Sequence, residues 1–519
     1  MGIVAVKSIE ERRLQEQARL DGLKSAQERN KWGQYATPPG LALSLARYAR
    51  TLMGKTPVQF LDPALGTGSF FSALSQVYPQ NSIATATGIE LDPLFSEAAE
   101  TLWGGEKLQV VQGDFTKQDV SQRFNLVLTN PPYVRHHHLS GVDKDRLKAQ
   151  IFRSLQLDIS GLSGLYCYFM LLSHDWMEER GLAVWLVPSE FMDVNYGGIV
   201  RHYLSARVTL LHIHRFCPTD VQFTDALVSS AVVVFRKSAP PADHAVRFSL
   251  AGPIERPYAE ALVPLDTLRQ SRKWTRFPTN TASVDTGEFK LGDLFTIKRG
   301  LATGNNKFFL LTETCIDEWQ IPRHFVKPIL PGPRYLSSDV IEALPSGAPL
   351  VSPSLFLLDC NEPEERIEAN WPRFFAYLQT GKEQKIDQAY LAGHRSPWYS
   401  QEQRPPAPFL CTYMGRSRNG AHPFRFLWNH SQATAHNVYL MLYPKGPLRN
   451  ALALRPELEA RVFEALQSIT AAHFATEGRV YGGGLHKVEP RELAQVPARN
   501  VLESIGPLAG IARQEKLFA

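Results

Sequence analysis

The sequence has little of what marks secreted, membrane or metal-binding proteins. Its five cysteines are scattered without a CxxC spacing, which predicts reduced, mostly buried thiols and no disulfide framework or zinc site. No apolar run is long enough to span a bilayer. Residues 8–31 are rich in Glu, Arg and Gln and lack the apolar core of a signal peptide. These absences predict a cytoplasmic protein with no membrane contact.

An excess of charge of one sign is also nearly absent. The formal net charge of this 519-residue chain is only +5. Such a balance is compatible with a polyanionic partner but does not indicate one, so evidence for such a partner has to come from local basic patches. The length predicts about two to four domains, each able to bury a core. Internal repeats and low-complexity tracts are lacking as well.

Short aliphatic runs alternate with helical stretches between residues 58 and 237. Several of these runs are largely apolar, as expected for strands covered on both faces of a mostly parallel sheet. The alternation predicts an α/β domain with a doubly wound, mostly parallel seven-stranded sheet. The expected strands are 58–61, 87–90, 108–111, 124–129, 183–187, 208–214 and 230–235.

Two further segments flank this domain. Residues 1–31 are expected to form a polar helical arm, whose imperfect apolar stripe (Ile9, Leu14, Ala18) docks on another surface or stays exposed. A linker-like Ser-Ala-Pro-Pro-Ala segment follows residue 237, so we assign residues 32–240 to the α/β domain. Beyond it the alternation fades while Pro and aromatic residues rise. Residues 251–519 are predicted to form a second domain of mixed α/β structure.

A glycine turn follows the first expected strand and opens a helix. Gly66 and Gly68 let the backbone approach a ligand closely, and the helix N-terminus beyond supplies free N–H groups. The spacing is not the six-residue GxGxxG dinucleotide fingerprint, which disfavours NAD. Taken alone, the turn is equally compatible with a plain connection from strand to helix.

Carboxylates end the second and third expected strands. Glu90 is placed to accept hydrogen bonds from ribose hydroxyls. Asp114 is placed to accept from an adenine amino group, with Phe115 packing on the ring. Each acid alone could be a helix cap. Their succession at strand ends, where open α/β sheets bind ligands, predicts one ligand site at that edge.

The fourth expected strand ends in Asn130-Pro131-Pro132-Tyr133. The prolines fix φ and lack N–H donors, so the turn is stiff and rich in acceptors. Asn130 adds a side-chain carbonyl, and Tyr133 offers a flat face on which a base can stack. This combination suits the task of holding a planar amine against an electrophile. An ordinary Pro-rich turn is the alternative, and the fourth place in the series of strand-end motifs disfavours it.

Further motifs flank these turns. They are Gln34-Tyr35-Ala36-Thr37-Pro38-Pro39 before the glycine turn, with Gly164-Leu165-Tyr166 and Val187-Pro188-Ser189-Glu190-Phe191 after the Asn-Pro-Pro-Tyr turn. Together the motifs resemble those of the γ-class DNA adenine-N6 methyltransferases of the restriction–modification type, the NPPY family. The resemblance is specific over residues 32–237 and looser beyond, where Leu294-Phe295 and 486–490 resemble parts of the family's recognition domain.

The resemblance implies a fold, a cofactor and a partner. The fold is the class I methyltransferase fold with a C-terminal DNA target-recognition domain over residues 251–519. The cofactor is S-adenosylmethionine, and the partner is double-stranded DNA. The residues expected at the cofactor are Thr37, Asp62, Gly66, Gly68, Glu90, Asp114 and Phe115.

The chemistry of the Asn-Pro-Pro-Tyr turn follows from the poor nucleophilicity of an exocyclic adenine amine, whose lone pair is delocalised into the ring. The carbonyls of Asn130 and Pro131 would hold this nitrogen in line with the methyl group, and positioning can lower a barrier by roughly 7–11 kcal/mol. Pro132 stiffens the turn. The base has to be flipped out of the duplex. Tyr133 is then expected to stack on it, and Phe223 to supply a second aromatic face in preference to Phe216.

No metal is needed for this chemistry. The run His136-His137-His138 resembles a metal tract, but adjacent histidines seldom share one site without further ligands. We interpret it as a solvated loop.

Basic residues interleaved with Gly, Asn and Thr suit loops that lie along a phosphate backbone. Arginines near Asn419 could also read base edges. A solvated surface loop is the open alternative for each candidate. The candidates for DNA contact are Arg272, Lys273, Lys298, Arg299, Lys307, Arg416 and Arg418.

The sequence therefore predicts a site-specific DNA adenine-N6 methyltransferase that protects DNA from a cognate restriction enzyme without forming a stable complex with it. A protein-glutamine methyltransferase shares the turn, but those chains are shorter and lack a large C-terminal domain with basic loops. An RNA-adenine methyltransferase is a third reading. An inactive DNA-binding subunit is disfavoured by the intact Asn130, Glu90, Gly66 and Tyr133. A fused nuclease is disfavoured because no convincing nuclease motif is found and the N-terminal arm is too short for that domain.

Overall fold

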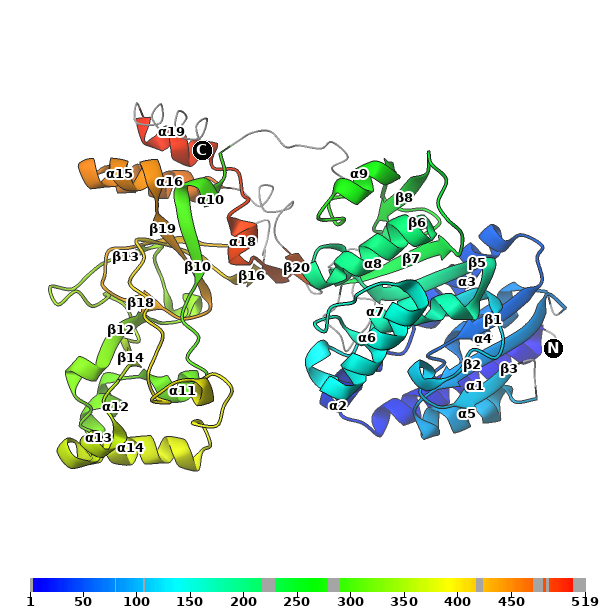
Figure 1. Ribbon diagram of the computed structural model, residues 1–519, viewed down its shortest axis with the longest axis horizontal. Coiled ribbons are helices and arrows are strands. Elements are labelled where there is room, and N and C mark those ends of the chain that lie inside the picture. The colour runs from blue at the N-terminus through cyan, green and yellow to red at the C-terminus, as the bar shows by residue number, and fades with distance from the viewer. Residues whose placement is uncertain are drawn as a thin grey trace. The chain divides into compact units, whose positions relative to one another are not determined.

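The computed structural model describes residues 3–79, 81–105, 108–216, 229–278, 289–416, 423–469, 479–481 and 485–506 (Figure 1). The chain forms two compact units. The first comprises Met1–Val284 with Tyr481–Gly483, and the second comprises Asp285–Val480 with Gly484–Ala519.

A nine-stranded sheet with the order β3-β2-β1-β4-β5-β7-β6-β8-β9 forms the centre of the first unit. β1 is parallel to β2 and β4, and β5 is parallel to β4, whereas β7 is antiparallel to β5 and β6. All seven expected strands are present, which confirms the α/β prediction. The strands are β1 Val58–Asp62, β2 Ile83–Glu90, β3 Leu108–Gln112, β4 Phe124–Thr129, β5 Met177–Pro188, β6 Thr209–Arg215, β7 Ser230–Arg236, β8 Ala245–Leu250 and β9 Ala259–Pro264.

Helices connect these strands. The longer ones are α1 Ile3–Gly22, α2 Ala26–Trp32, α3 Pro39–Met53, α4 Ser69–Val77, α5 Pro93–Trp103, α6 Gly141–Leu155, α7 Leu165–Leu172, α8 Gly198–His202 and α9 Leu265–Gln270. Short helical turns are η1 Phe115–Lys117, η2 His136–His138, η3 Ser173–Trp176, η4 Ser189–Met192, η5 Asn195–Gly197 and η6 Tyr203–Arg207.

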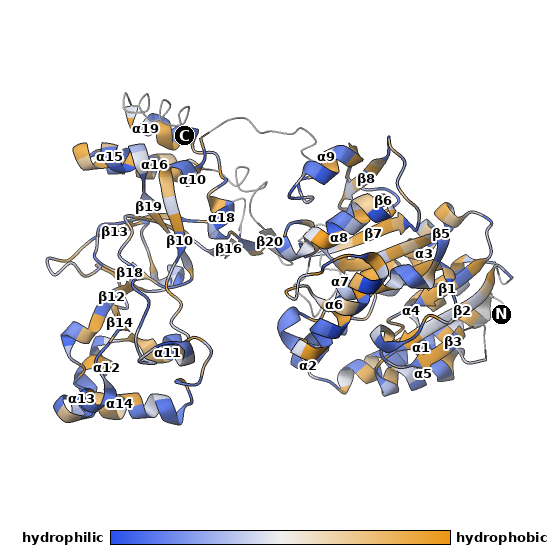
Figure 2. Ribbon diagram, viewed as in Figure 1, coloured by the Kyte–Doolittle hydropathy of each residue, from blue (hydrophilic) through white to orange (hydrophobic). Residues whose placement is uncertain are grey.

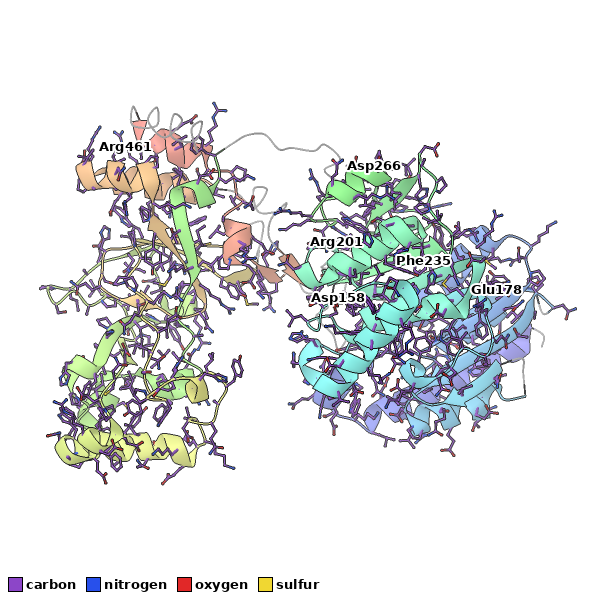
Figure 3. All side chains as sticks on the ribbon, viewed as in Figure 1. Asp158, Glu178, Arg201, Phe235, Asp266 and Arg461 are labelled. Carbon is purple, nitrogen blue, oxygen red and sulfur yellow. The ribbon has the colours of Figure 1, made fainter. Side chains whose placement is uncertain are left out.

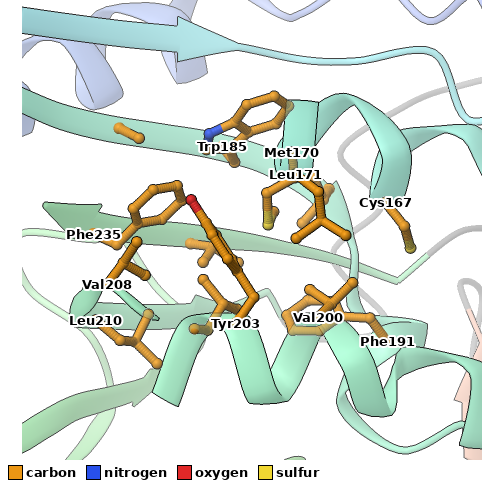
Figure 4. Packing of buried hydrophobic residues seen from close by; sticks show 14 of the residues in the cluster. Cys167, Met170, Leu171, Trp185, Phe191, Val200, Tyr203, Val208, Leu210 and Phe235 are labelled. Carbon is orange, nitrogen blue, oxygen red and sulfur yellow. The ribbon is translucent and has the colours of Figure 1, made fainter. Parts of the chain in front are cut away.

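Both faces of the sheet are covered, as expected for largely apolar strands. Alternate residues of β4 enter two different cores: Leu126 and Leu128 join helices α3, α4 and α5, while Val127 joins α6, α7 and α8. Figure 4 shows part of the second of these cores, with Trp185 of β5 and Tyr203 of η6 among its members. The hydrophobic colour of the strands in Figure 2 agrees with this burial. In Figure 3, Phe235 is one of the buried side chains, whereas Asp158 and Asp266 are exposed.

The N-terminal arm docks on the first unit itself. Helix α1 contacts α4 and α5, and its buried positions are Val6, Arg13 and Leu20. Of the apolar stripe inferred from the sequence, Ile9 packs against the core, whereas Leu14 is 40% exposed and Ala18 is exposed. The docking face is largely polar at its centre, so apolar periodicity did not reveal it.

The sheet continues beyond the segment that composition suggested as a linker. β8 is parallel to β6, and β9 is antiparallel to β8. Trp274 is buried and its ring packs against Phe248 of β8. The first compact unit therefore extends to Val284, whereas the predicted domain limit at residue 240 rests on composition alone.

The second unit has mixed α/β structure, as predicted. A five-stranded sheet has the order β10-β19-β15-β17-β13 and a four-stranded sheet the order β11-β14-β12-β18, while β16 pairs with β21. The strands are β10 Phe295–Arg299, β11 Leu310–Leu311, β12 Val326–Leu330, β13 Val340–Ile341, β14 Leu355–Leu358, β15 Phe409–Thr412, β16 Met414–Arg416, β17 Phe426–Asn429, β18 Thr434–Ala435, β19 Tyr439–Pro444, β20 Arg479–Tyr481 and β21 Leu485–Lys487.

Short helices pack around these sheets and help to form the second unit's cores. They are α10 Leu291–Leu294, α11 Asn306–Phe309, α12 Glu313–Glu318, α13 Glu364–Asn370, α14 Pro372–Glu383, α15 Gly446–Leu454, α16 Leu458–Gln467, α18 Pro490–Leu493 and α19 Arg499–Ser504, with the turns η7 Arg323–Phe325, η8 Pro333–Tyr335 and η9 Ala392–His394. Within the described ranges, no helix is long and apolar enough to cross a membrane.

The cysteines that the structure describes are free thiols, as predicted. Cys167, Cys360 and Cys411 are buried, and Cys315 is partly buried. Cys217 lies outside the described residues.

Candidate active site

The candidate residues meet at the carboxyl ends of β1, β2, β3 and β4. These four strands are neighbours in the sheet and run parallel, so the turns that follow them lie at one edge. Two contacts show how closely the motifs approach each other. The backbone N–H of Gly66 donates to Glu90 (2.8 Å), and the hydroxyl of Thr129 donates to Asp62 (2.7 Å).

The two glycines of the turn after β1 have different surroundings. Both have positive φ, +56° at Gly66 and +87° at Gly68, which favours glycine. A Cβ at Gly68 would lie 2.5 Å from the indole nitrogen of Trp103, whereas a Cβ at Gly66 would meet no atom within 4 Å. Gly68 is therefore required by packing inside the fold, and Gly66 faces open space that a ligand can approach.

Asp62 and Glu90 are buried carboxyl groups beside this open space. Asp62 accepts from the N–H of Ala64 (3.1 Å) as well as from Thr129, yet burial outweighs these hydrogen bonds and raises the pKa of Asp62 to about 7. Burial also raises the pKa of Glu90, which accepts from the N–H groups of Gly66 and Asp92. Burial penalises the ionised form of both groups, and a cationic ligand would offset that penalty.

Asp114 caps the turn after β3, and Phe115 points into the core. The Asp114 carboxylate accepts from the N–H (2.9 Å) and the hydroxyl (2.8 Å) of Thr116. The ring of Phe115 is 3% exposed and packs against Phe169 (centroids 5.0 Å apart) and Trp176 (5.5 Å). Asp114 therefore caps this turn in the structure. The cap does not prevent Asp114 from also accepting a hydrogen bond from a ligand.

Only the nitrogen of the Asn130 side-chain amide forms hydrogen bonds. Its amide nitrogen donates to the Tyr35 carbonyl (3.0 Å) and to the Thr37 hydroxyl (3.1 Å). The carbonyl, which can only accept, fixes the direction of the amide. Its side-chain oxygen is buried and has no hydrogen-bond partner, and no donor contacts the Pro131 carbonyl within the part of the chain that the structure describes. Buried acceptors in proteins nearly always have a donor, so these two carbonyls are acceptors to which a ligand could donate.

The rest of the turn is held firmly. The Tyr133 N–H donates to the Gly33 carbonyl (3.2 Å), and its hydroxyl donates to the Leu186 carbonyl of β5 (3.1 Å). The ring lies 5.6 Å from that of Tyr35 at an angle of 43°. Burial raises the pKa of the Tyr133 hydroxyl well above its usual value, so it stays a neutral donor.

The motifs on either side of the turn surround it. Thr37, from the segment before α3, is the Asn130 partner, and its carbonyl accepts from the Ser69 hydroxyl at the start of α4 (3.1 Å). The Leu165 N–H donates to the Val134 carbonyl directly after the turn (2.9 Å). The sequence motifs before and after the turn thus contact the turn in the folded chain.

The histidine run forms the short turn η2 near the surface, where His137 and His138 are exposed. Among the residues that the structure describes, no group of three or more His, Cys, Asp or Glu side chains could hold a metal ion. Phe223, the expected second stacking residue, lies outside the described residues. Phe216 is buried and packs edge-on against His214, as a core residue does.

The candidate DNA contacts are divided between the units. Arg272 and Lys273 belong to the first unit, beside the buried Trp274. The exposed Lys298, Arg299, Lys307 and Arg416 belong to the second unit, on β10, α11 and β16. The guanidinium of Arg299 lies over the Tyr413 ring, 3.9 Å from its centroid. Arg418 lies outside the described residues.

Two family models match this chain. The model described as "Eco57I restriction-modification methylase" matches residues 78–222, and the model of the C-terminal domain of the Type II methyltransferase M.Eco57I matches residues 279–516. The chain is thus similar to restriction–modification DNA methyltransferases. The first match includes the turns after β2, β3 and β4, and the second covers nearly all of the second unit.

Individual relatives agree with the family models. The Type II methyltransferase M.XamI of Xanthomonas campestris pv. amaranthicola is 28% identical over 457 residues, which are 85% of this chain and 80% of that protein. M.AccI of Acinetobacter calcoaceticus is 25% identical over 495 residues, 90% of this chain and 85% of that protein. A tRNA1(Val) (adenine(37)-N6)-methyltransferase of Actinobacillus pleuropneumoniae matches a shorter stretch: 29% identity over 136 residues, 25% of this chain and 52% of that protein.

A solved structure shares the fold. The Type IIL restriction–modification enzyme MmeI, determined in complex with DNA, has a TM-score of 0.57 at 12% identity, covering 96% of this chain and 78% of that one. This likeness concerns the fold, and it agrees with the predicted order of an α/β domain followed by a mixed α/β domain.

Proposed function

We propose that this protein is a γ-class, site-specific DNA adenine-N6 methyltransferase that uses S-adenosylmethionine. The observation that supports it most is the unpartnered side-chain oxygen of Asn130. A buried acceptor without a donor costs about 1–3 kcal/mol, and such a cost is expected where a ligand supplies the donor. An amine with two N–H groups fits the Asn130 and Pro131 carbonyls together.

In this proposal the turn positions the amine of the target base. The Tyr35 carbonyl can only accept, so reversing the Asn130 amide would lose that hydrogen bond and place two carbonyl oxygens against each other; the Asn130 oxygen therefore keeps facing the substrate. Accepting from the amine draws its lone pair out of conjugation with the ring and aims it at the methyl donor. Positioning of this kind needs no strong base and can supply roughly 7–11 kcal/mol.

The edge of the sheet fits S-adenosylmethionine. When bound, this cofactor supplies an electrophilic methyl group. The open space beside Gly66 admits a ligand against the backbone, and the carboxylates of Asp62 and Glu90 supply acceptors for its hydroxyl and amino groups. Asp114 is a further acceptor at the end of β3. Thr37, Gly68 and Phe115 are proposed to shape this site, with Gly68 and Phe115 acting mainly through packing.

Several observations favour duplex DNA as the substrate. The named relatives that match most of the chain are Type II methyltransferases, and their similarity includes the second unit. The tRNA methyltransferase, whose name states adenine N6 as its target, matches only 136 residues. Adenine N6 chemistry is thus supported by a relative that matches 136 residues of this chain, and the second unit supports DNA over RNA or a protein glutamine.

The target adenine has to leave the duplex to reach a turn at a strand end. Tyr133 is proposed to stack on the flipped base, with Phe223 as a second stacking residue. The second unit, which lies within residues 251–519, is proposed to recognise the target sequence, with the first unit, including residues 32–240, as the catalytic part and residues 1–31 as its arm. Arg272, Lys273, Lys298, Arg299, Lys307, Arg416 and Arg418 are proposed to contact DNA. The methylation would protect DNA from a cognate endonuclease that forms no stable complex with this chain.

A direct transfer assay tests this function. The purified chain is incubated with S-adenosylmethionine carrying a labelled methyl group and with genomic DNA that lacks adenine methylation. We expect label in N6-methyladenine at one recurring sequence, read by nucleoside analysis and by sequencing of modified bases. Parallel reactions with total tRNA and with a cell protein extract separate the alternatives. Label in those substrates but not in DNA, or label in no substrate, would contradict the proposal.

A further inference from the structure

Helix α1 presents a buried polar face to the glycine turn. Glu10, Arg13 and Gln17 are spaced by three and four residues, so they lie on one side of the helix. The buried Val6 and Leu20 extend the same side at its two ends. Arg13 is only 1% exposed and is among the largest fully buried side chains of the chain. Arginine is rarely buried to this degree unless it is paired, so this face calls for an explanation beyond docking.

The polar face contacts the side chains of the glycine turn and of the helix that follows it. Arg13 forms a two-fold hydrogen bond with the Glu10 carboxylate (both 2.7 Å), and its remaining arm donates to the Thr67 hydroxyl (3.1 Å). The Thr67 hydroxyl in turn donates to the Gln17 side-chain oxygen (2.8 Å). The hydroxyl of Ser72, on α4, donates to the Glu10 carboxylate (2.5 Å). Every polar group in this set has a partner.

Thr67 stands between Gly66 and Gly68 and is fixed by two elements. Its hydroxyl is held by α1, and its carbonyl accepts from the Trp103 indole of α5 (3.0 Å). The neighbouring Gly66 N–H is held by Glu90 of β2. Gly66 itself faces open space. Helix α1 and the indole thus support Thr67, while the adjoining Gly66 faces the proposed cofactor space.

A second contact links the same N-terminal segment to the end of β2. Lys24, just after α1, forms an ion pair with Asp92, and the Gln34 amide also donates to Asp92 (3.3 Å). The Asp92 N–H donates to Glu90 (2.8 Å). The segment from α1 to residue 34 therefore reaches both the glycine turn and the residue next to Glu90.

Anchoring alone could be achieved with apolar side chains, at less desolvation cost than a buried ion pair. A buried arginine with fully satisfied hydrogen bonds adds direction, because its planar fork fixes the atoms that it contacts. The contact here falls on the side chain between the two glycines, where the backbone has the greatest freedom.

We propose that helix α1 is a positioning element for the cofactor, in which Arg13 and Gln17 fix Thr67 and thereby hold the glycine turn in its binding conformation. This inference rests on the proposed function, because the ligand of the turn is taken to be S-adenosylmethionine. Arg13 and Gln17 are positioning residues and do not touch the cofactor themselves.

The test uses Thr67 because removal of Arg13 would leave the Glu10 carboxylate buried without its partner and threatens folding. In the full chain, Thr67→Val keeps the shape and removes the hydroxyl, Thr67→Ser keeps the hydroxyl, and Arg19→Ala is the matched control. Arg19 lies on the exposed side of α1, in a surface pair with Glu16. Calorimetry with S-adenosylmethionine and with S-adenosylhomocysteine measures affinity, and transfer kinetics separate KM from kcat.

We expect Thr67→Val to weaken cofactor affinity by about tenfold or more, the size of one lost charge-assisted hydrogen bond. The KM for S-adenosylmethionine should rise by the same factor, with kcat at saturation and the KM for DNA little changed. Thr67→Ser should bind within about threefold of the wild type, and Arg19→Ala should match it.

Two outcomes contradict different statements. A wild-type chain that binds neither ligand would refute the proposed function and this inference together. The other outcome is that the wild type binds both ligands and Thr67→Val binds them with equal affinity but has a lower melting temperature. This outcome would refute only the inference, because α1 would then support the fold without affecting the cofactor.

Discussion

Replacing Asn130 by alanine should separate catalysis from stability. The substitution removes the two hydrogen bonds that the amide donates, to the Tyr35 carbonyl and the Thr37 hydroxyl. It also removes the buried side-chain oxygen that lacks a donor. The first change destabilises the folded chain and the second stabilises it, so the two effects oppose each other.

The magnitudes are similar. Two hydrogen bonds contribute about 1 kcal/mol each, and relief of an unpaired buried acceptor returns about 1–3 kcal/mol. The free energy of unfolding should therefore change by no more than about 1 kcal/mol. Methyl transfer should fall by about 100-fold or more, as when one preorganised polar contact to the reacting group is removed.

Asn125 is a matched control on β4, the strand that Asn130 follows. Its side-chain oxygen accepts from the Gln59 N–H (2.9 Å) and its nitrogen donates to the Pro57 carbonyl (2.8 Å), so both ends are satisfied. Asn125→Ala has no compensating relief and should cost about 2 kcal/mol. It lies at the start of the strand, away from the turn, and should retain transfer.

Urea unfolding of both variants and transfer of a labelled methyl to unmethylated DNA are the assays. The expected pattern is a stable, inactive Asn130→Ala chain beside a less stable, active Asn125→Ala chain. A loss of stability in Asn130→Ala as large as in Asn125→Ala would show that its oxygen is not an unpaired acceptor. Retained transfer in Asn130→Ala would refute its role at the amine.

Three further predictions concern other parts of the site. Burial raises the pKa of Asp62 from 3.8 to about 7, so between these pH values the folded chain holds a proton that the unfolded chain releases. As pH rises through this window, the free energy of unfolding of the wild type should fall relative to that of Asp62→Asn, by at most about 1.4 kcal/mol per pH unit. Urea unfolding that shows the same pH dependence for both chains would contradict this. Gly66→Ala should abolish cofactor binding measured by calorimetry and should lower the stability of the fold by only about 1 kcal/mol. Gly68→Ala, whose methyl would lie 2.5 Å from an indole nitrogen, should lower the stability measured by thermal unfolding by about 2–4 kcal/mol. Equal losses of stability in the two variants would contradict the different roles of the two glycines. The double variant Lys298→Ala/Lys307→Ala should reduce the slope of log affinity for DNA against log salt concentration by about 2. An unchanged slope in filter binding would show that these lysines do not contact DNA.

Local patterns determined most of the first unit. Each expected strand was a short apolar run bounded by turn residues, and each appeared in the sheet because both faces of these strands are buried. The acids and the Asn-Pro-Pro-Tyr turn could be placed at one edge from the sequence because parallel strands end on the same side. The extension of the sheet by β8 and β9 was missed, since β9 is mostly exposed and interrupted by charge.

Tertiary structure decided what each of these residues contacts. The sequence shows two similar glycines, and only the packing of Trp103 separates Gly68 from Gly66. It shows a polar N-terminal helix with a weak apolar stripe, but the buried side carries Arg13, whose partner Thr67 lies 54 residues away. The positions of the strands along the chain follow from residue type and local periodicity. The partners of a buried polar group come from distant segments, and neither periodicity nor motif spacing encodes them.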